Sequence, residues 1–239
     1  MPPEQFTLRL DVPQSQTFDN FVCGRNDELV TFLQRPLPRA NRRAPEFDGV
    51  WLYGAPSSGR SHLLRATLLH AHEQGVMATY VGCGDYPPGA AALGHALEHA
   101  TRHGQVVALD DVDRLTGSHE QQLLFAIVQR LLLEGGRLLL CHQQPAQEVG
   151  FELQDLASRV RSLQHFALYP LDDEGKALLL RRRASARGYE LGQAVLDYWL
   201  ARGPRELARL LEDLERLDQA SLARLRKITV PLLKDVLGY

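Results

Sequence analysis

The eight residues Gly54–Ser61, with the sequence GAPSSGRS, constrain the fold of this chain more than any other stretch. They follow a short apolar run at 50–53 and precede a segment at 60–73 whose apolar residues recur at helical spacing. A strand that passes through such a turn into a helix is typical of a phosphate-binding loop, because its glycines let successive backbone amides face phosphate oxygens. The positive end of the following helix adds to this attraction. The alternative is a glycine-rich turn that binds nothing.

Arginine stands in this loop where the usual pattern, G-x-x-x-x-G-K-[ST], has lysine. The guanidinium of Arg60 is a wide planar fork, whereas a lysine ammonium is a compact charge that fits between the β- and γ-phosphates. We therefore expect the chain to bind a nucleotide, with a preference for a diphosphate, and to hydrolyse it poorly. Ser61 is expected to offer its hydroxyl to Mg²⁺. The nucleotide-binding residues predicted in this loop are Gly54, Ser57, Ser58, Gly59, Arg60 and Ser61.

Two aspartates end a second apolar run, VVAL at 106–109, about fifty residues after the loop. This is the Walker B arrangement, in which a strand end projects carboxylates towards bound phosphates. Asp110 is predicted to hold Mg²⁺, and Asp111 to act as a base or as a carboxylate that orients a water. Alternatively, the two aspartates are an acidic strand-to-loop junction with no functional role. The phosphate-binding loop earlier in the chain favours the functional interpretation.

The next apolar run, at 138–141, is followed by His142 and Gln143. A polar residue at this strand end commonly contacts the γ-phosphate. Gln143 is the first candidate for this contact and His142 the second, although either residue could equally lie in a solvated loop.

Strand and helix patterns alternate along the first two thirds of the chain, which indicates an α/β fold with a parallel sheet flanked by helices. Five strands are expected, at 50–53, 77–81, 106–109, 138–141 and 166–168, with helices at 60–73, 91–102 and 120–134. After Pro170 only helical patterns follow, at 172–186, 193–202, 205–220 and 230–237. The predicted organisation is a flexible arm at 1–15, an α/β domain at 16–169 and a small all-helical lid domain at 170–239.

Composition limits the class of protein. The formal net charge of -2 argues against a generally basic nucleic-acid surface. Three scattered cysteines cannot form a disulfide framework. We found neither a signal peptide nor an apolar stretch long enough to span a membrane, so we expect a reduced, cytoplasmic setting and no membrane partner.

Taken together, the motifs resemble those of the AAA+ ATPases and, among them, the replication initiator DnaA. TFDNFVCG at 17–24 is similar to the segment that leads into the DnaA nucleotide domain. DLASR at 155–159 resembles the segment whose arginine points at a neighbouring subunit's nucleotide, which makes Arg159 the expected arginine finger and Arg161 its fallback. GPREL at 203–207 resembles the stretch with the sensor-2 arginine, here Arg205. The resemblance adds Phe21, Val22 and His62 to the expected nucleotide-binding residues.

The chain also departs from DnaA. We expect no helix-turn-helix DNA-binding domain after the lid, and the N-terminal arm contains QFTLRL at 5–10. This arm resembles the Q-L-x-L-x-L motif that docks on the sliding clamp of DNA polymerase III, with Gln5, Phe6, Leu8 and Leu10 as contacts. Phe6 replaces the usual leucine.

These features together resemble a DnaA homologue that acts in the regulatory inactivation of DnaA. The resemblance implies bound ADP (or ATP) with Mg²⁺, docking on the DNA-loaded clamp (the beta subunit), and stimulation of ATP hydrolysis by DnaA. DNA would be reached indirectly, through the clamp, and a homo-oligomer is compatible with the fold. Such a protein would activate the DnaA ATPase without being a strong ATPase itself.

Two other functions stay open. An autonomous AAA+ ATPase, such as a helicase loader, is compatible with Asp110 and Asp111, and measurable turnover by the chain alone would favour it. A nucleotide-independent adaptor would carry the loop as a relic, and thermal stabilisation by ADP would argue against that alternative.

Overall fold

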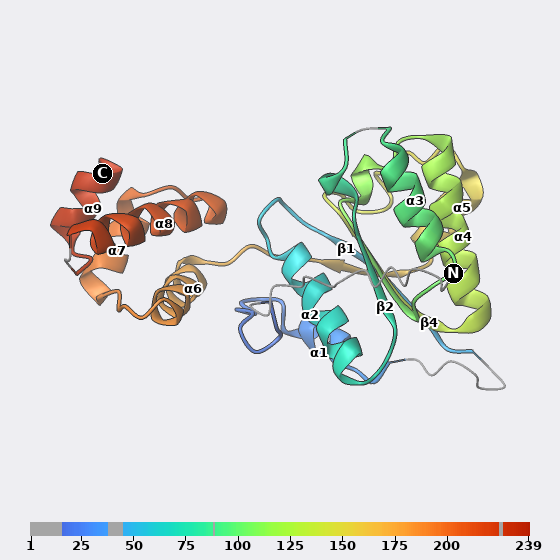
Figure 1. The fold of residues 1–239 in the computed structure, drawn as a ribbon, viewed down its shortest axis with the longest axis horizontal. Helices are drawn as coiled ribbons and strands as arrows, with labels where there is room; N and C mark the ends of the chain where they lie inside the picture. Colours follow the sequence, from blue (N-terminus) through green and yellow to red (C-terminus); the bar gives the residue numbers. More distant parts are fainter. Residues whose placement is uncertain (1–15, 38–44, 88, 225–226) are drawn as a thin grey trace, which may run out of the picture. The chain divides into compact units, whose positions relative to one another are not determined.

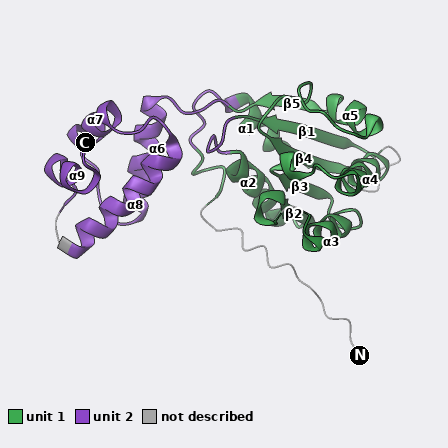
Figure 2. Cartoon of the chain, turned by 90° about the horizontal axis from the view of Figure 1, so that it is seen from above, with its two compact units in different colours: residues 1–21, 28–54, 60–168 green, residues 22–27, 55–59, 169–239 purple. Residues whose placement is uncertain are grey.

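The computed structural model describes residues 16–37, 45–87, 89–224 and 227–239, which Figure 1 colours along the sequence. The chain forms two compact units, drawn in green and purple in Figure 2. Among the described residues, unit 1 comprises those within 16–21, 28–54 and 60–168, and unit 2 comprises those within 22–27, 55–59 and 169–239. No helix in the described ranges is long and apolar enough to cross a membrane.

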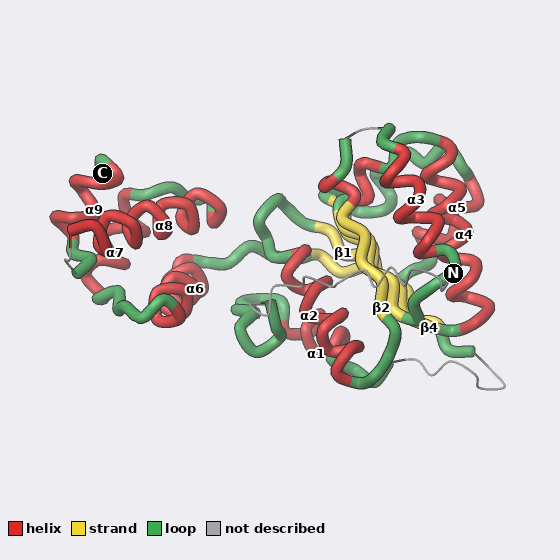
Figure 3. The backbone as a smooth tube through the Cα atoms, viewed as in Figure 1, coloured by secondary structure: helices red, strands yellow, loops and turns green. Residues whose placement is uncertain are grey.

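Unit 1 is built on a parallel five-stranded sheet, as the alternating pattern predicts (Figure 3). Its strands are β1 (Phe47–Tyr53), β2 (Ala78–Gly82), β3 (Val106–Asp110), β4 (Gly136–His142) and β5 (Gln164–Ala167), in the order β2-β3-β4-β1-β5. β1 lies between β4 and β5, and every residue of β3 and β4 is buried, in keeping with the apolar runs at 106–109 and 138–141 within them. All five carboxyl ends therefore meet at one edge, where the motif residues follow the strands.

Helices cover both faces of the sheet. Figures 1 and 2 place α1 (Asp27–Leu33) and α2 (Arg60–Glu73) on one face, and α3 (Ala91–Ala100), α4 (Ser118–Glu134) and α5 (Gln154–Arg161) on the other. Two short 3₁₀ helices, η1 (Cys83–Asp85) and η2 (Val112–Arg114), follow β2 and β3. The core between the sheet and α3–α5 is apolar, and its members include Trp51, Val107, Leu109, Leu138, Leu140, Leu97, Leu124, Ile127, Leu156 and Val160.

The sequence patterns did not predict α1 or α5. These helices have only seven and eight residues, and helices so short have little stability without tertiary packing. α1 packs through Leu29, Val30, Phe32 and Leu33, and α5 through Leu156, Ala157 and Val160. Both helices thus depend on the core that they help to form.

A buried arginine on β4 ties the end of α1 to the sheet. Arg137 is fully buried, its Nη1 donates to the Leu33 carbonyl at 2.9 Å, and its Nη2 lies 2.8 Å from the Asp48 carboxylate. A buried charge is tolerated when it is paired and hydrogen-bonded in this way. The cation thereby fixes the chain entering β1.

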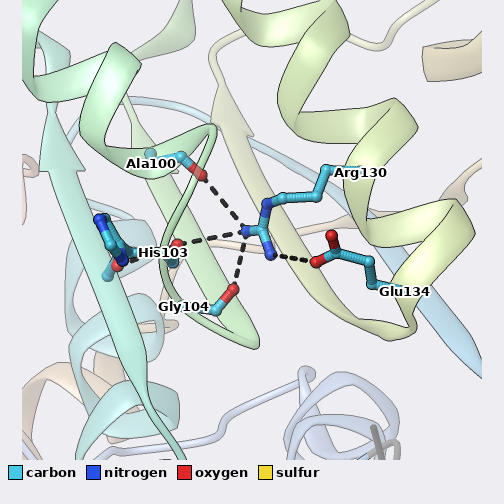
Figure 4. A network of polar contacts seen from close by, with 6 residues as sticks. Ala100, His103, Gly104, Arg130 and Glu134 are labelled. Atoms are coloured by element: carbon cyan, nitrogen blue, oxygen red, sulfur yellow. Dashed lines mark hydrogen bonds and ion pairs between the residues drawn. The ribbon is translucent and has the colours of Figure 1, made fainter. Parts of the chain in front are cut away.

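A second arginine, Arg130 on α4, closes the carboxyl end of α3 (Figure 4). Its Nη2 donates to the carbonyls of Ala100, His103 and Gly104 at 3.3, 3.2 and 2.8 Å. Its Nη1 lies 3.2 Å from the Glu134 carboxylate. Ala100 is the last residue of α3, and the last carbonyls of a helix lack intrahelical donors. The guanidinium thus supplies a donor to the end of the helix and to the segment that follows it.

Two glycines make the change from α4 to β4, where the sequence predicts the helix to stop: Gly135 lies between the two elements and Gly136 begins the strand. Gly135 and Gly136 have φ of 81° and 147°, values that favour glycine. A Cβ on Gly136 would lie 2.4 Å from the Gln105 carbonyl, so only glycine fits this close approach.

Among the described residues of unit 2, all regular secondary structure is helical, which confirms the predicted helical lid domain. Its helices are α6 (Asp173–Ala186), α7 (Gln193–Arg202), α8 (Leu207–Arg224) and α9 (Val230–Leu237). The Asp172 carboxylate accepts from the Gly175 amide at 2.8 Å and caps α6. The core of the unit surrounds Trp199 and includes Leu180, Leu196, Leu210, Leu214, Leu217 and Leu233.

One asparagine joins two distant segments of unit 2. Asn26 is buried, its Nδ2 donates to the Tyr169 carbonyl at 2.9 Å, and its Oδ1 accepts from the Tyr169 amide at 2.8 Å. Segment 22–27 is thereby attached to the residue at which the chain enters the C-terminal helices.

Candidate functional site

The loop between β1 and α2 has a backbone suited to binding an anion. Ser57 and Gly59 have φ of 61° and 105°, so the chain turns through the left-handed region twice within three residues. The Gly54 amide donates to the His142 carbonyl at 3.3 Å, which joins the start of the loop to the end of β4. Left-handed residues at the spacing of Ser57 and Gly59 direct backbone amides to one side of a loop, which forms an anion-binding concavity.

Two polar atoms in this segment are buried without a hydrogen-bond partner among the described residues: the Ser58 hydroxyl and Arg60 Nη1. Arg60 is 8% exposed, so its guanidinium has left water with part of its bonding capacity unused. Phosphate oxygens are acceptors of the kind that both donors need. The residues present therefore fit a bound phosphate.

Asp110 is the last residue of β3 and is buried. One carboxylate oxygen accepts from the Tyr80 hydroxyl at 3.2 Å, and that hydroxyl accepts from Arg65 at 3.3 Å. The other oxygen accepts from the Asp111 amide at 3.1 Å. This chain of contacts orients the carboxylate and leaves lone pairs available for a cation.

The neighbouring Asp111 has a left-handed backbone, with φ 51° and ψ 48°, and starts the turn that becomes η2. One of its oxygens lies 3.6 Å from Arg60 Nη2. Burial and the Asp110 charge raise the pKa of the Asp111 carboxyl, and Arg60 opposes this shift. The structure thus brings together Arg60 and the acidic pair within unit 1.

The two candidates after β4 differ in environment. His142 is the last residue of the strand and is buried, whereas Gln143 is exposed and lies outside the strand. The His142 ring stacks on Trp51 with ring centroids 5.2 Å apart, and its Nδ1 accepts from the Gln144 amide at 2.8 Å. Burial lowers the pKa of His142, which favours a neutral imidazole with its proton on Nε2.

Residues from the segment before α1 meet the start of α2. The rings of Phe21 and His62 are 5.2 Å apart between centroids, and His62 Nε2 contacts the Thr17 carbonyl at 2.9 Å. Val22 is buried and is grouped with unit 2. Ser61 lies in the first turn of α2 and is half-buried.

Arg159 on α5 is exposed, whereas Leu156 and Val160 on the same helix are buried. In the part of the chain that the structure describes, its guanidinium makes no ion pair or hydrogen bond. Arg161 is exposed and unpaired in the same sense. Two free cations on one short helix are thus available to another molecule.

Arg205 lies in unit 2, immediately before α8. Its Nη1 is 3.2 Å from the Asp173 carboxylate at the start of α6, and its side chain is 74% exposed. Such an exposed pair is weak and leaves the guanidinium able to exchange partners.

Two sets of expected contacts are incomplete in the described residues. Gln5, Phe6, Leu8 and Leu10 lie outside them. Within them, no three His, Cys, Asp or Glu side chains converge on a possible metal position. Ser61 and Asp110 would thus contribute to a Mg²⁺ site completed by phosphates and waters, as is usual for this ion.

Two residues of the site were not found from the sequence. Tyr80 gave no signal, because a tyrosine in an apolar strand is common, yet it holds Asp110. Asp113 has a buried carboxylate oxygen with no partner among the described residues and lies near enough to raise the pKa of Asp111. Its spacing after Asp110 and Asp111 was the only available signal.

Residues 12–168 match the family model of the bacterial DnaA ATPase domain. The chain belongs to this DnaA family. Residues 173–237 of this DnaA-family chain match a second model, described as the lid domain of Hda. The two matches confirm an Hda- and DnaA-like AAA+ protein and support a DnaA-related regulator.

Solved structures agree with the fold of this DnaA-family chain. Domain III of DnaA from Thermotoga maritima is 20% identical, with a TM-score of 0.78 over 94% of this chain and 96% of that chain. AMPPCP-bound DnaA from Aquifex aeolicus is 19% identical, with a TM-score of 0.68 over 89% and 67% of the two chains. The RuvB Holliday junction branch migration motor of Thermotoga maritima is 13% identical, with a TM-score of 0.61 over 80% and 61%.

Proposed function

We propose that this chain, with a nucleotide bound, stimulates ATP hydrolysis by the initiator DnaA and so limits replication initiation. The observation that carries the proposal is Arg159 on α5 of a DnaA-like core, which is exposed and whose guanidinium has no ion-pair or hydrogen-bond partner among the described residues. A cation lent by one protein to the γ-phosphate held by another accelerates phosphoryl transfer by about 10³–10⁵ in GTPases. Arg159 would supply this charge, because it needs no rearrangement of existing pairs to reach a partner.

The chain's own nucleotide is proposed to act as a structural ligand. The buried donors of Ser58 and Arg60 and the amides of the loop would hold its phosphates, and ADP is the nucleotide that Arg60 favours. The AMPPCP-bound DnaA of Aquifex aeolicus supports nucleotide binding by this fold. A bound ligand of this kind stabilises the folded state and selects among its conformations.

Ser61 and Asp110 would hold Mg²⁺ beside these phosphates, where the ion neutralises their charge. Asp110 is already oriented by Tyr80. Arg205 would contribute a further phosphate contact by leaving Asp173, since that exposed pair is weak.

The arm at 5–10 is proposed to recruit the protein to the DNA-loaded sliding clamp. Its alternating apolar residues suit an extended peptide that inserts side chains into a hydrophobic groove. Recruitment would raise the local concentration of the regulator near DNA through the clamp.

The proposal is tested by reconstitution with ATP-bound DnaA, clamp loaded on DNA and this chain. We expect the native chain to accelerate hydrolysis and Arg159→Ala to lower that acceleration by at least about a hundredfold. Arg161→Ala tests the neighbouring cation, and Arg102→Ala, an exposed arginine after α3, is the matched control. Full stimulation by Arg159→Ala would refute the proposal.

The acidic pair favours one competing function, an autonomous ATPase. Asp110 and Asp111 both remain at the end of β3, where a hydrolysing enzyme needs them. Rapid multiple turnover by the chain without DnaA or clamp would establish that function instead.

A further inference from the structure

Gln121 on α4 is 3% exposed, and both ends of its amide group are used. Its Nε2 donates to the Leu115 carbonyl at 3.3 Å. Its Oε1 accepts from the backbone amides of Glu152 and Leu153, at 3.0 and 3.4 Å. A buried amide is costly unless it is satisfied, so three contacts to backbone groups of two separate loops mark a side chain that joins them.

The first of these loops begins at the nucleotide site. The Arg114 amide donates to the Asp111 carbonyl at 3.0 Å, and the Leu115 amide donates to the Val112 carbonyl at 3.1 Å. The segment from Asp111 to Leu115 is therefore one hydrogen-bonded turn. It starts at the carboxylate that faces Arg60 and ends at the carbonyl that Gln121 holds.

The second loop leads into α5. Leu153 is the residue before the helix, and its side chain offers no oxygen to cap the helix amides. Gln121, from another helix, instead accepts from the backbone amides of the two residues that precede α5, Glu152 and Leu153. Leu156 and Val160 are buried and fix the rotation of α5 about its axis, so that Arg159 faces outward. The contacts at 152 and 153 fix the position of α5 along that axis.

We propose that Gln121 is a positioning residue, which holds α5 in register with the turn after the acidic pair and thereby sets where Arg159 is presented. This inference rests on the proposed function, in which Arg159 acts on the nucleotide of DnaA. A side chain displaced along a helix by even a fraction of a turn fails to reach a γ-phosphate in a partner, since stabilisation of developing charge depends on position.

The test compares Gln121→Leu, which keeps the approximate volume and removes all three contacts, with the native chain. Gln122→Leu is the matched control, because Gln122 is its exposed neighbour on the same helix. We expect Gln121→Leu to speed amide hydrogen exchange at 152, 153 and the first turn of α5 by about tenfold. Stimulation of DnaA should fall by about tenfold, while the ADP-induced rise in Tm stays unchanged.

A conservative variant separates positioning from general stability. Gln121→Glu keeps the two acceptor contacts to the loop before α5 and loses the donation to Leu115, so it should keep the amides of 152 and 153 protected and restore most of the stimulation. If Gln121→Leu does not fold, Gln121→Asn, one methylene shorter, replaces it with the same expectations.

The inference fails if amide exchange at 152 and 153 is native-like in Gln121→Leu, whatever happens to DnaA. It also fails if stimulation and the ADP-induced rise in Tm are lost together, which would indicate a purely structural role. Failure of the proposed function is a different result, because the native chain itself would then leave DnaA hydrolysis unchanged.

Discussion

Arg60 and Asp111 face each other across the loop end of the sheet, with Nη2 and Oδ1 separated by 3.6 Å. The arginine stands in the lysine position of the loop, and the aspartate stands one residue beyond the strand that carries Asp110. At this separation the Asp111 carboxylate binds the Arg60 guanidinium only weakly. Arg60 Nη1 has no hydrogen-bond acceptor among the described residues. A lysine in this position would place its charge between the phosphates, whereas the charge of Arg60 also interacts with Asp111.

This arrangement predicts slow hydrolysis by the native chain alone. We expect a rate on the order of 10⁻²–10⁻⁴ s⁻¹, as in NTPases that lack their activating arginine or partner. Arg60→Lys should raise this rate while nucleotide affinity stays within about tenfold, because both side chains are cationic. Single-turnover assays and calorimetric titration with ADP measure the two quantities. A fast native rate would contradict the prediction.

The stability of the chain should depend on Asp111 and on pH. Burial and the Asp110 charge raise the pKa of Asp111 above its ordinary value of 3.8, so the native state binds this proton more tightly than the unfolded state. The ionised Asp111 carboxylate therefore lowers the free energy of unfolding. This decrease develops as the pH rises from 3.8 through the raised native pKa.

We accordingly expect Asp111→Asn to have a higher Tm than the native chain at neutral pH, with a difference that disappears in acid below the ordinary pKa. Asparagine also tolerates the left-handed backbone at this position. Thermal melts between acid and neutral pH measure the difference, with Glu148→Gln in an exposed loop as the control. An equal or growing difference in acid would refute the assignment.

The contacts of Arg130 predict an asymmetry between the two partners of its ion pair. Arg130→Met leaves three carbonyls at the end of α3 without this donor and should cost about 1–3 kcal/mol of unfolding free energy. Glu134→Gln disturbs only an exposed pair and should cost less than about 0.5 kcal/mol. Urea denaturation of both variants measures the costs, and equal losses would be inconsistent with the helix-closing role.

Deletion of residues 5–10 should abolish association with the clamp and leave Tm and ADP binding unchanged. The expectation follows from the alternating apolar pattern of the arm. Surface plasmon resonance on immobilised clamp measures the association, and replacement of Thr7 and Arg9 by alanine, which alternate with the proposed contacts, serves as the control. Unimpaired clamp binding by the deletion would exclude the arm as the docking element.

Much of the candidate site was accessible from the sequence because its residues follow strand ends. The loop at 54–61, the acids at 110 and 111 and the polar pair at 142 and 143 each come directly after an apolar run. The carboxyl ends of parallel strands lie at one edge of the sheet, so the order of apolar runs and polar residues in the sequence predicts that these residues lie close together. The helical character after Pro170 followed from periodicity in the same way.

By itself, the sequence determined the alternation of strands and helices, the five-stranded parallel sheet and the edge at which the motifs lie, because hydrophobic period and turn residues are local properties. Only the tertiary structure decided that α1 and α5 are helices, that Arg60 faces Asp111, that Tyr80 holds Asp110 and that Gln121 joins two loops. These outcomes depend on contacts between residues that are far apart in the chain. Their energies come from burial and hydrogen bonding that exist only once the core has formed.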